Sequence, residues 1–224
     1  MNAKVVLFLS VGTLLMTVPM LIIQKRYQQA LWKVLPIALA SLVAGTLSAY
    51  LFFWLENGEF GGRSFYGVVL LIPVLYFPFA KILRMPYGEL MDLCAPAECV
   101  ILVMMKVLCQ LEGCCGGRVV AFTSDGIPVR FPSRMAELAV AVIIFGVLML
   151  LAWHKKQRGC LYAWYMLFYG STRFVLNIFR EEWLTTELLM PLGNMWSVCA
   201  VAIALIVLLR NRKQTVKNKI AKQC

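Results

Sequence analysis

The chain has 224 residues, of which 61% are hydrophobic and 15% are charged, and its mean hydropathy of +0.78 excludes an ordinary soluble globular protein. The formal net charge of +11 would suit a nucleic-acid partner. The basic residues, however, are concentrated in alternate connections between apolar segments, which is typical of a membrane protein, so we expect no nucleic-acid binding.

The apolar segments predict an all-α integral membrane protein with about seven transmembrane helices, because each segment is close to the roughly 20 residues that cross a bilayer. The connections are short, so residues 1–224 are expected to form a single polytopic membrane domain. The first segment lacks a small-residue cleavage site and is interpreted as a retained helix. The predicted spans are residues 4–24, 32–55, 65–80, 90–110, 135–153, 161–179 and 187–209.

The charges of the connections predict the orientation of the chain. By the positive-inside rule, the basic connections are cytoplasmic, which places the N-terminus outside and the C-terminus in the cytoplasm. The longest connection, residues 111–133, is then an outer loop, and residues 210–224 form a basic cytoplasmic tail. Eight cysteines show neither a disulfide framework nor metal-ligand spacing, so no metal or cofactor is expected. The basic residues of the other connections are Lys25, Arg26, Lys33, Lys81, Arg84, Lys155, Lys156 and Arg158.

Four polar residues follow helical spacing in the sixth predicted span. Tyr169, Arg173, Asn177 and Arg180 stand at positions i, i+4, i+8 and i+11, so they share one face of the helix. A charge such as that of Arg173 costs several kcal/mol within a membrane unless it faces a wet or paired interior. This stripe therefore predicts a site for an anionic headgroup.

The fourth and fifth spans carry further charges whose roles stay open at this point. Lys106 either pairs with Glu98, eight residues earlier on the same helical face, or faces a functional cavity. Asp92, near the cytoplasmic end, is interpreted as a paired or snorkelling side chain. Ser133 suits a helix cap, and Glu137 suits either the start of that helix or a functional role.

Most of these polar residues belong at or toward the outer ends of their spans, where they would surround one outward-opening, positively charged cavity. Arginine forks bind phosphate bidentately, and a dry pocket strengthens that interaction. We therefore predict an outer-leaflet site for an anionic phospholipid. The candidate residues are Arg63, Tyr66, Lys106, Arg118, Ser133, Arg134, Glu137, Tyr169, Arg173, Asn177, Arg180 and Asn194.

At these residues the chain resembles the prolipoprotein diacylglyceryl transferase family. Residues 61–67 resemble the family's Gly-Gly-x-Ser-x-His-Gly segment, and residues 92–118 resemble Asp-x-x-Ala-Pro followed by the Gly-Arg-x-Gly-Asn-Phe-x-Asn signature. Residues 130–137 resemble Arg-His-Pro-Ser-Gln-x-Tyr-Glu. Residues 169–181 resemble Tyr-Gly-x-x-Arg-Phe-x-x-Glu-Phe-Phe-Arg. The similarity runs in order from about Gly61 to Ser197.

The chain departs from the family pattern at several positions. Tyr66 and Phe131 replace histidines, and Ala136 replaces a tyrosine. The remaining differences are Lys106 for arginine, Cys109 for asparagine and Asn177 for glutamate. The residues expected to bind phosphate are thus kept while those expected to move protons are altered, which favours a divergent member or a paralogue.

The resemblance implies a phospholipid-dependent transferase in the bacterial plasma membrane. It would move diacylglyceryl from phosphatidylglycerol to the cysteine thiol of a prolipoprotein lipobox peptide, releasing glycerol phosphate. On this hypothesis Arg118 and Arg173 bind the phosphate, Arg180 and Tyr169 support them, and Lys106 adds positive charge. The base would be Glu137, Tyr66 or neutral Lys106, unless the local field ionises the thiol directly. The substrate-binding residues would be Arg63, Ser133, Arg134, Tyr169, Asn177, Arg180 and Asn194.

Two other functions stay open. The replaced histidines favour a non-catalytic or differently reacting phospholipid-binding paralogue. A small-solute transporter is less well supported, because the sequence shows neither inverted repeats nor paired broken helices. The last alternative is a purely structural helix bundle with ordinary buried polar pairs. It would leave the positions of Lys106 and Arg173 as a coincidence.

Overall fold

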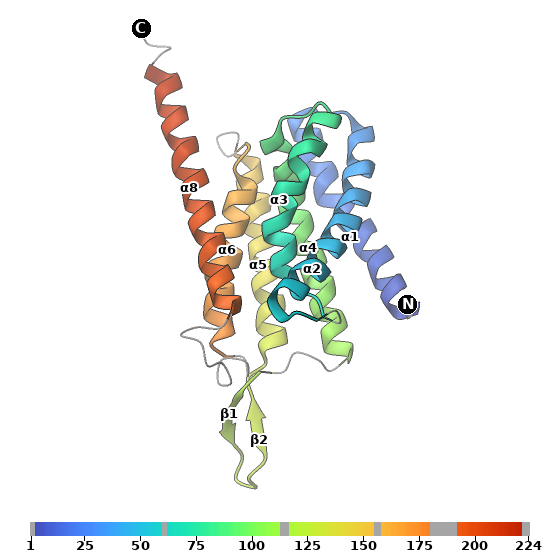
Figure 1. Ribbon diagram of the computed structural model, residues 1–224, viewed down its shortest axis with the longest axis vertical. Coiled ribbons are helices and arrows are strands. Elements are labelled where there is room, and N and C mark those ends of the chain that lie inside the picture. The colour runs from blue at the N-terminus through green and yellow to red at the C-terminus, as the bar shows by residue number, and fades with distance from the viewer. Residues whose placement is uncertain (1–2, 60–61, 113–116, 155–157, 180–191, 221–224) are drawn as a thin grey trace.

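The computed structural model describes residues 3–59, 62–112, 117–154, 158–179 and 192–220. Its helices run up and down in one bundle, and a two-stranded hairpin projects from one end (Figure 1). The helices are α1 (Ala3–Tyr27), α2 (Val34–Asn57), α3 (Phe65–Ile82), α4 (Tyr87–Glu112), α5 (Ser133–Trp153), α6 (Leu161–Asn177) and α8 (Leu192–Ile220), with a short 3-10 turn at Leu31–Lys33.

The prediction of a helical membrane protein is confirmed at the level of helix length and composition. Four segments of the described chain are long and apolar enough to cross a membrane, namely Leu31–Asn57, Phe65–Ile82, Ser133–Trp153 and Leu192–Lys213. The other three predicted spans coincide with α1, α4 and α6, which pack within the same bundle. Seven crossings, the orientation of the termini and the single-domain organisation stay predictions.

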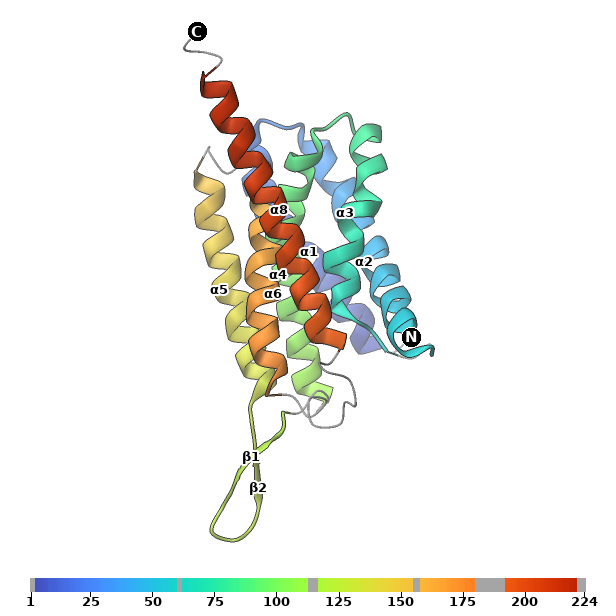
Figure 2. The same cartoon turned by 60° about the vertical axis from the view of Figure 1, so that its left-hand side comes forward.

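The two ends of the bundle differ in charge. The α1–α2 and α3–α4 connections, the end of α5, the start of α6 and the C-terminal part of α8 lie at the end opposite the hairpin (Figures 1 and 2). These segments carry basic residues predicted to be cytoplasmic, so we call this end the basic end, while Lys155 and Lys156 lie outside the described residues. The opposite end, which carries the hairpin, is called the hairpin end and corresponds to the predicted outer side.

The predicted outer loop contains two strands that were not expected from the sequence. Strand β1 (Val119–Phe122) pairs antiparallel with β2 (Pro128–Arg130), and the register is irregular between Val119 and Ala121. Ser124 to Gly126 lie in the turn between these strands, where Gly126 has a φ of +74°. The hairpin leads directly into α5.

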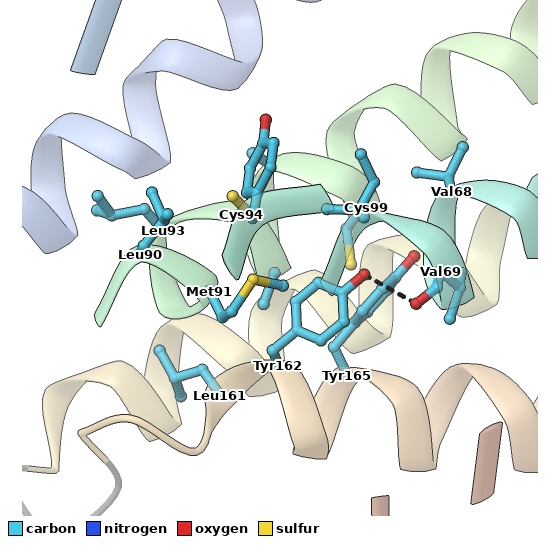
Figure 3. Packing of buried hydrophobic residues seen from close by; sticks show 14 of the residues in the cluster. Val68, Val69, Leu90, Met91, Leu93, Cys94, Cys99, Leu161, Tyr162 and Tyr165 are labelled. Atoms are coloured by element: carbon cyan, nitrogen blue, oxygen red, sulfur yellow. Dashed lines mark hydrogen bonds between the residues drawn. The ribbon is translucent and has the colours of Figure 1, made fainter. Parts of the chain in front are cut away.

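Helices α3, α4 and α6 meet in the core of the bundle. Figure 3 shows Val69 of α3 and Cys99 of α4 beside Tyr162 and Tyr165 of α6. Tyrosine hydroxyls within this core need partners, and the neighbouring Tyr162 donates to the backbone carbonyl of Val69 at 3.0 Å. The core therefore fixes the three helices that carry much of the polar candidate site.

The start of α3 lies unusually close to α2. A Cβ atom on Gly67 would approach the carbonyl oxygen of Ser48 to 2.1 Å, a distance that no side chain tolerates. Only glycine allows this approach. The contact places the neighbouring Tyr66 in the interior, where it is 5% exposed.

Candidate functional site

Three charged residues from three helices meet at the hairpin end. The Glu137 carboxylate forms ion pairs with both the Lys106 ammonium, through Oε2, and the Arg173 guanidinium, through Oε1. We call these residues the charge cluster. The antiparallel order of α4, α5 and α6 explains the meeting, because it brings the last turns of α4 and α6 beside the first turns of α5.

The charge cluster is shielded but not neutral. The side chains of Lys106 and Arg173 are 11% and 13% exposed, and that of Glu137 is 6% exposed. Buried charges need partners, and among the described residues the two cations share this one carboxylate, so the three side chains together carry one excess positive charge. A small hollow beside it is lined by Glu137, Arg173 and Tyr169, together with apolar side chains. This arrangement can attract and hold an anion.

The predicted pairing of Lys106 with Glu98 was wrong. Glu98 shares a helical face with Lys106, but its carboxylate accepts hydrogen bonds from the Tyr162 hydroxyl at 3.0 and 3.2 Å. Lys106 instead pairs with Glu137 of the neighbouring helix. Spacing along α4 identified residues that share a face, whereas the packing of α5 decided which partner was used.

A polar network lies beside the charge cluster and joins α3, α6 and α8. The Tyr66 hydroxyl lies 2.6 Å from the Ser197 hydroxyl, which itself donates to the Gly193 carbonyl at 3.0 Å. Tyr66 is therefore the donor to Ser197. The Asn177 amide donates to the Tyr66 oxygen at 3.4 Å, and the Tyr66 ring packs edge-on against Tyr169 with centroids 5.8 Å apart. Tyr66, Asn177 and Ser197 form what we call the polar network.

Sequence reasoning missed Ser197. A signal was present, since Ser197 stands one helical turn after Asn194 in an otherwise apolar segment. The structure buries both side chains completely at the start of α8, where the Asn194 amide donates to the Phe174 carbonyl at 3.5 Å. Asn194 thus holds α8 against α6 in the described part of the site.

The predicted phosphate ligand Arg118 lies at the base of the hairpin. Its guanidinium lies over the Phe179 ring, 5.3 Å from the centroid, and its backbone N–H donates to the Phe179 carbonyl at 3.0 Å. Phe131 stacks on the same ring at 4.6 Å. Among the described residues, none of the contacts of Arg118 reaches Lys106, Glu137 or Arg173. Arg118 therefore anchors the hairpin to the end of α6.

Other candidates have structural contacts of their own. Ser133 is not a helix cap, because it is the first residue of α5 and the capping position is taken by Pro132. Arg134 donates to the Cys109 carbonyl at 3.3 Å, which ties α5 to α4. Arg63 contacts Tyr50 at the end of α2, away from the charge cluster. Arg180 lies outside the described residues.

The stripe predicted on the sixth span holds for its described members. Tyr169 and Arg173 line the hollow of the charge cluster, and Asn177 joins them through Tyr66. Within the described ranges, no group of three or more His, Cys, Asp or Glu residues is arranged to hold a metal ion.

Comparison with known proteins identifies the family of the chain. Residues 6–210 match the family profile described as prolipoprotein diacylglyceryl transferase. The chain is 24% identical over 176 residues to a phosphatidylglycerol–prolipoprotein diacylglyceryl transferase of Francisella tularensis subsp. novicida, covering 71% of this chain and 63% of that protein. A protein of the same name from Geobacter sulfurreducens is 29% identical over 128 residues, covering 54% of this chain and 49% of that protein. The match thus spans less than two thirds of the length of these relatives. Since the family profile covers most of the chain, the chain belongs to the prolipoprotein diacylglyceryl transferase family.

Proposed function

We propose that this protein transfers a diacylglyceryl group from phosphatidylglycerol to the cysteine thiol of a prolipoprotein at the outer leaflet of the bacterial plasma membrane. Its partners are then an anionic phospholipid, a prolipoprotein lipobox peptide and the membrane. The observation that carries this proposal is the unbalanced positive charge of Lys106 and Arg173 around Glu137. The family and the names of its relatives supply the reaction.

In the proposed reaction, the cysteine sulfur forms a bond to the glycerol carbon of the diacylglyceryl group. The bond between that carbon and the phosphate oxygen breaks, and glycerol phosphate leaves with the electron pair. Lys106 and Arg173 bind the phosphate and stabilise the charge that develops on it, an interaction that is strong in a site sheltered from water. The same positive charge favours the thiolate over the thiol.

Glu137 is best assigned as a positioning residue. Each of its carboxylate oxygens is engaged by a different cation, so its role is to hold Lys106 and Arg173 at a fixed separation. Tyr66 is the candidate to exchange the thiol proton, because its hydroxyl is held between Ser197 and Asn177 and lies next to Tyr169. Tyr169, Asn177 and Asn194 then shape the site, while Arg118, Ser133 and Arg134 order its hairpin side.

The test is transfer of label from phosphatidylglycerol to a single-cysteine lipobox peptide in liposomes. Arg173→Ala should lower kcat/KM by at least about tenfold, or about 1.4 kcal/mol. Arg212→Ala is the matched control, since Arg212 is exposed at the basic end, and it should transfer at the wild-type rate. Undiminished transfer by Arg173→Ala would disprove the assignment.

One observation favours a second candidate, a phospholipid-binding paralogue without this chemistry. The only histidine of the sequence, His154, follows α5 at the basic end, so no histidine serves the charge cluster. For this candidate, the wild type would retain anionic lipid through purification and show no transfer to the peptide.

A further inference from the structure

A separate cavity of about 190 Å³ lies between α1, α2, α3 and α4. It extends along α2 from Ser41 to Tyr50, roughly 14 Å at the helical rise of 1.5 Å per residue. Met105 of α4 lines this cavity, whereas the next residue, Lys106, belongs to the charge cluster. The cavity and the charge cluster therefore lie against different faces of α4.

The polar side chains in the cavity wall are satisfied by the protein itself. The Ser41 hydroxyl lies 2.6 Å from the Tyr76 hydroxyl, and Thr46 donates to the Leu42 carbonyl at 2.7 Å. The Glu98 carboxylate accepts the hydrogen bond of Tyr162 from the opposite side. An occupant of the cavity therefore need not supply hydrogen bonds to these groups, and the rest of the lining is largely apolar. The space exceeds the approximately 150 Å³ of an apolar cavity that takes up benzene, so it can admit a hydrocarbon segment.

A cation stands at the hairpin-end mouth of the same cavity. Arg63 and Tyr50 both line it. The Arg63 Nε donates to the Tyr50 hydroxyl at 3.0 Å, and the guanidinium lies 5.2 Å from the centre of the Tyr50 ring. In the part of the chain that the structure describes, no carboxylate pairs with Arg63. The terminal nitrogens of the guanidinium therefore point to an anionic partner from outside the protein.

We propose that this cavity binds one acyl chain of an anionic glycerophospholipid whose phosphate lies against Arg63. Apolar walls and a cation at the mouth match the two ends of such a lipid. Because Arg63 and the cavity lie away from Lys106 and Arg173, this lipid is a second, resident molecule, distinct from the donor of the proposed transfer reaction. Lipid retention does not depend on catalysis, so this inference is testable even if the proposed transfer reaction fails.

Two glycines provide a matched pair of variants. Gly45 lines the cavity, and a Cβ atom there would have only Val68 at 4.0 Å, so Gly45→Leu fills the cavity without a backbone clash. Gly146 of α5 has nothing within 4 Å of such a Cβ atom and is exposed, so Gly146→Leu makes the same change elsewhere. Ala49→Leu is a second cavity-filling variant that guards against misfolding of the first.

The measurement is native mass spectrometry of phospholipid retained by detergent-purified protein. Gly45→Leu and Ala49→Leu should each retain at least about tenfold less lipid than Gly146→Leu and the wild type. Arg63→Gln should lose the preference for phosphatidylglycerol over phosphatidylethanolamine, and Arg63→Lys should keep it. Wild-type lipid retention by both cavity-filling variants, each folded, would overturn the proposal.

A second arm separates the resident lipid from the donor. Gly45→Leu should lose the retained lipid while the acyl-chain-length profile of transfer stays that of the wild type. A shift of transfer toward phosphatidylglycerol with shorter acyl chains in Gly45→Leu, absent from Gly146→Leu, would show that the cavity holds the donor and would overturn the assignment of a resident lipid. Absence of transfer by the wild type would contradict the proposed reaction and leave the retention measurement as the test of the cavity.

Discussion

At the basic end, the buried carboxylate of Asp92 is surrounded by uncharged donors, whereas at the hairpin end the carboxylate of Glu137 is shared by two cations. Asp92 accepts hydrogen bonds from the Tyr27 hydroxyl at 2.7 Å and from the backbone N–H groups of Gly159 and Leu161. Nearby, Glu89 pairs with a single arginine, Arg158, at 2.7 Å. The protein thus supplies both of these carboxylates with partners, and the contacts join helices at this end.

The hairpin end also buries a carboxylate, but there two cations share it. Lys106 and Arg173 exceed their one carboxylate, so this region keeps the capacity to bind an anion. A buried charge in a membrane bundle is therefore not by itself evidence of a site. What distinguishes the two ends is whether the protein supplies a full set of partners.

The largest expected effect is on stability, and it belongs to the basic end. Asp92→Ala removes the acceptor for three donors from α1 and the start of α6, which then remain buried without partners. The free energy of unfolding in detergent should fall by about 3 kcal/mol or more. Lipid retained per folded molecule should not change, because the charge cluster and the cavity mouth lie at the other end.

Glu89→Gln is the control for this change. Its partner Arg158 has a side chain that is 45% exposed, so the loss should stay below about 1 kcal/mol. A loss of less than about 1 kcal/mol for Asp92→Ala as well would show that the contacts of Asp92 do not hold the bundle together at the basic end.

A smaller effect is expected when the excess positive charge of the charge cluster is increased. Glu137→Gln removes the only negative charge of the charge cluster and releases Lys106 and Arg173 from their fixed separation. Transfer should fall by about tenfold, equivalent to about 1.4 kcal/mol, while anionic lipid is retained at least as well as by the wild type. The two measurements are peptide labelling and native mass spectrometry of the same preparation.

Glu137→Asp separates positioning from proton transfer, because it keeps the charge on a shorter side chain. We expect it to restore part of the transfer lost in Glu137→Gln without changing the pH dependence of kcat. Loss of bound anionic lipid in Glu137→Gln would contradict the assignment of the two cations to the phosphate.

Hydropathy predicted the helices well because it reports directly on membrane burial. The predicted spans at 32–55, 65–80 and 135–153 differ by only a few residues from α2, α3 and α5. The hairpin was not predicted, because its residues from Val120 to Arg130 are all exposed and show no alternation between a buried and an exposed face. Its strands are also shorter than the windows in which such patterns are visible.

The partners within the candidate site were harder to predict than its members. Arg173 and Lys106 stand out in the sequence because a charged side chain in an apolar segment is costly unless it is paired or faces a polar cavity. Nothing in the spacing along one helix says which neighbouring helix faces it, so Glu98 was as good a partner for Lys106 as Glu137. The same limit applies to Arg118, whose contact with the Phe179 ring could not be predicted from spacing and whose role in phosphate binding stays a prediction.

The smallest predicted effect tests whether the polar network serves the charge cluster or only the packing of α8. Ser197→Ala removes the acceptor of the Tyr66 hydrogen bond and costs about 1 kcal/mol, so transfer should fall about fivefold if Tyr66 exchanges the thiol proton. Tyr66→Phe should lower transfer further, and the double variant should match Tyr66→Phe alone, because residues that act through one another are not additive. Ser48→Ala is the control, since its buried hydroxyl has no hydrogen-bond partner in the described structure. If the two losses simply multiplied in the double variant, Ser197 would act on packing alone, and Tyr66 would not depend on it.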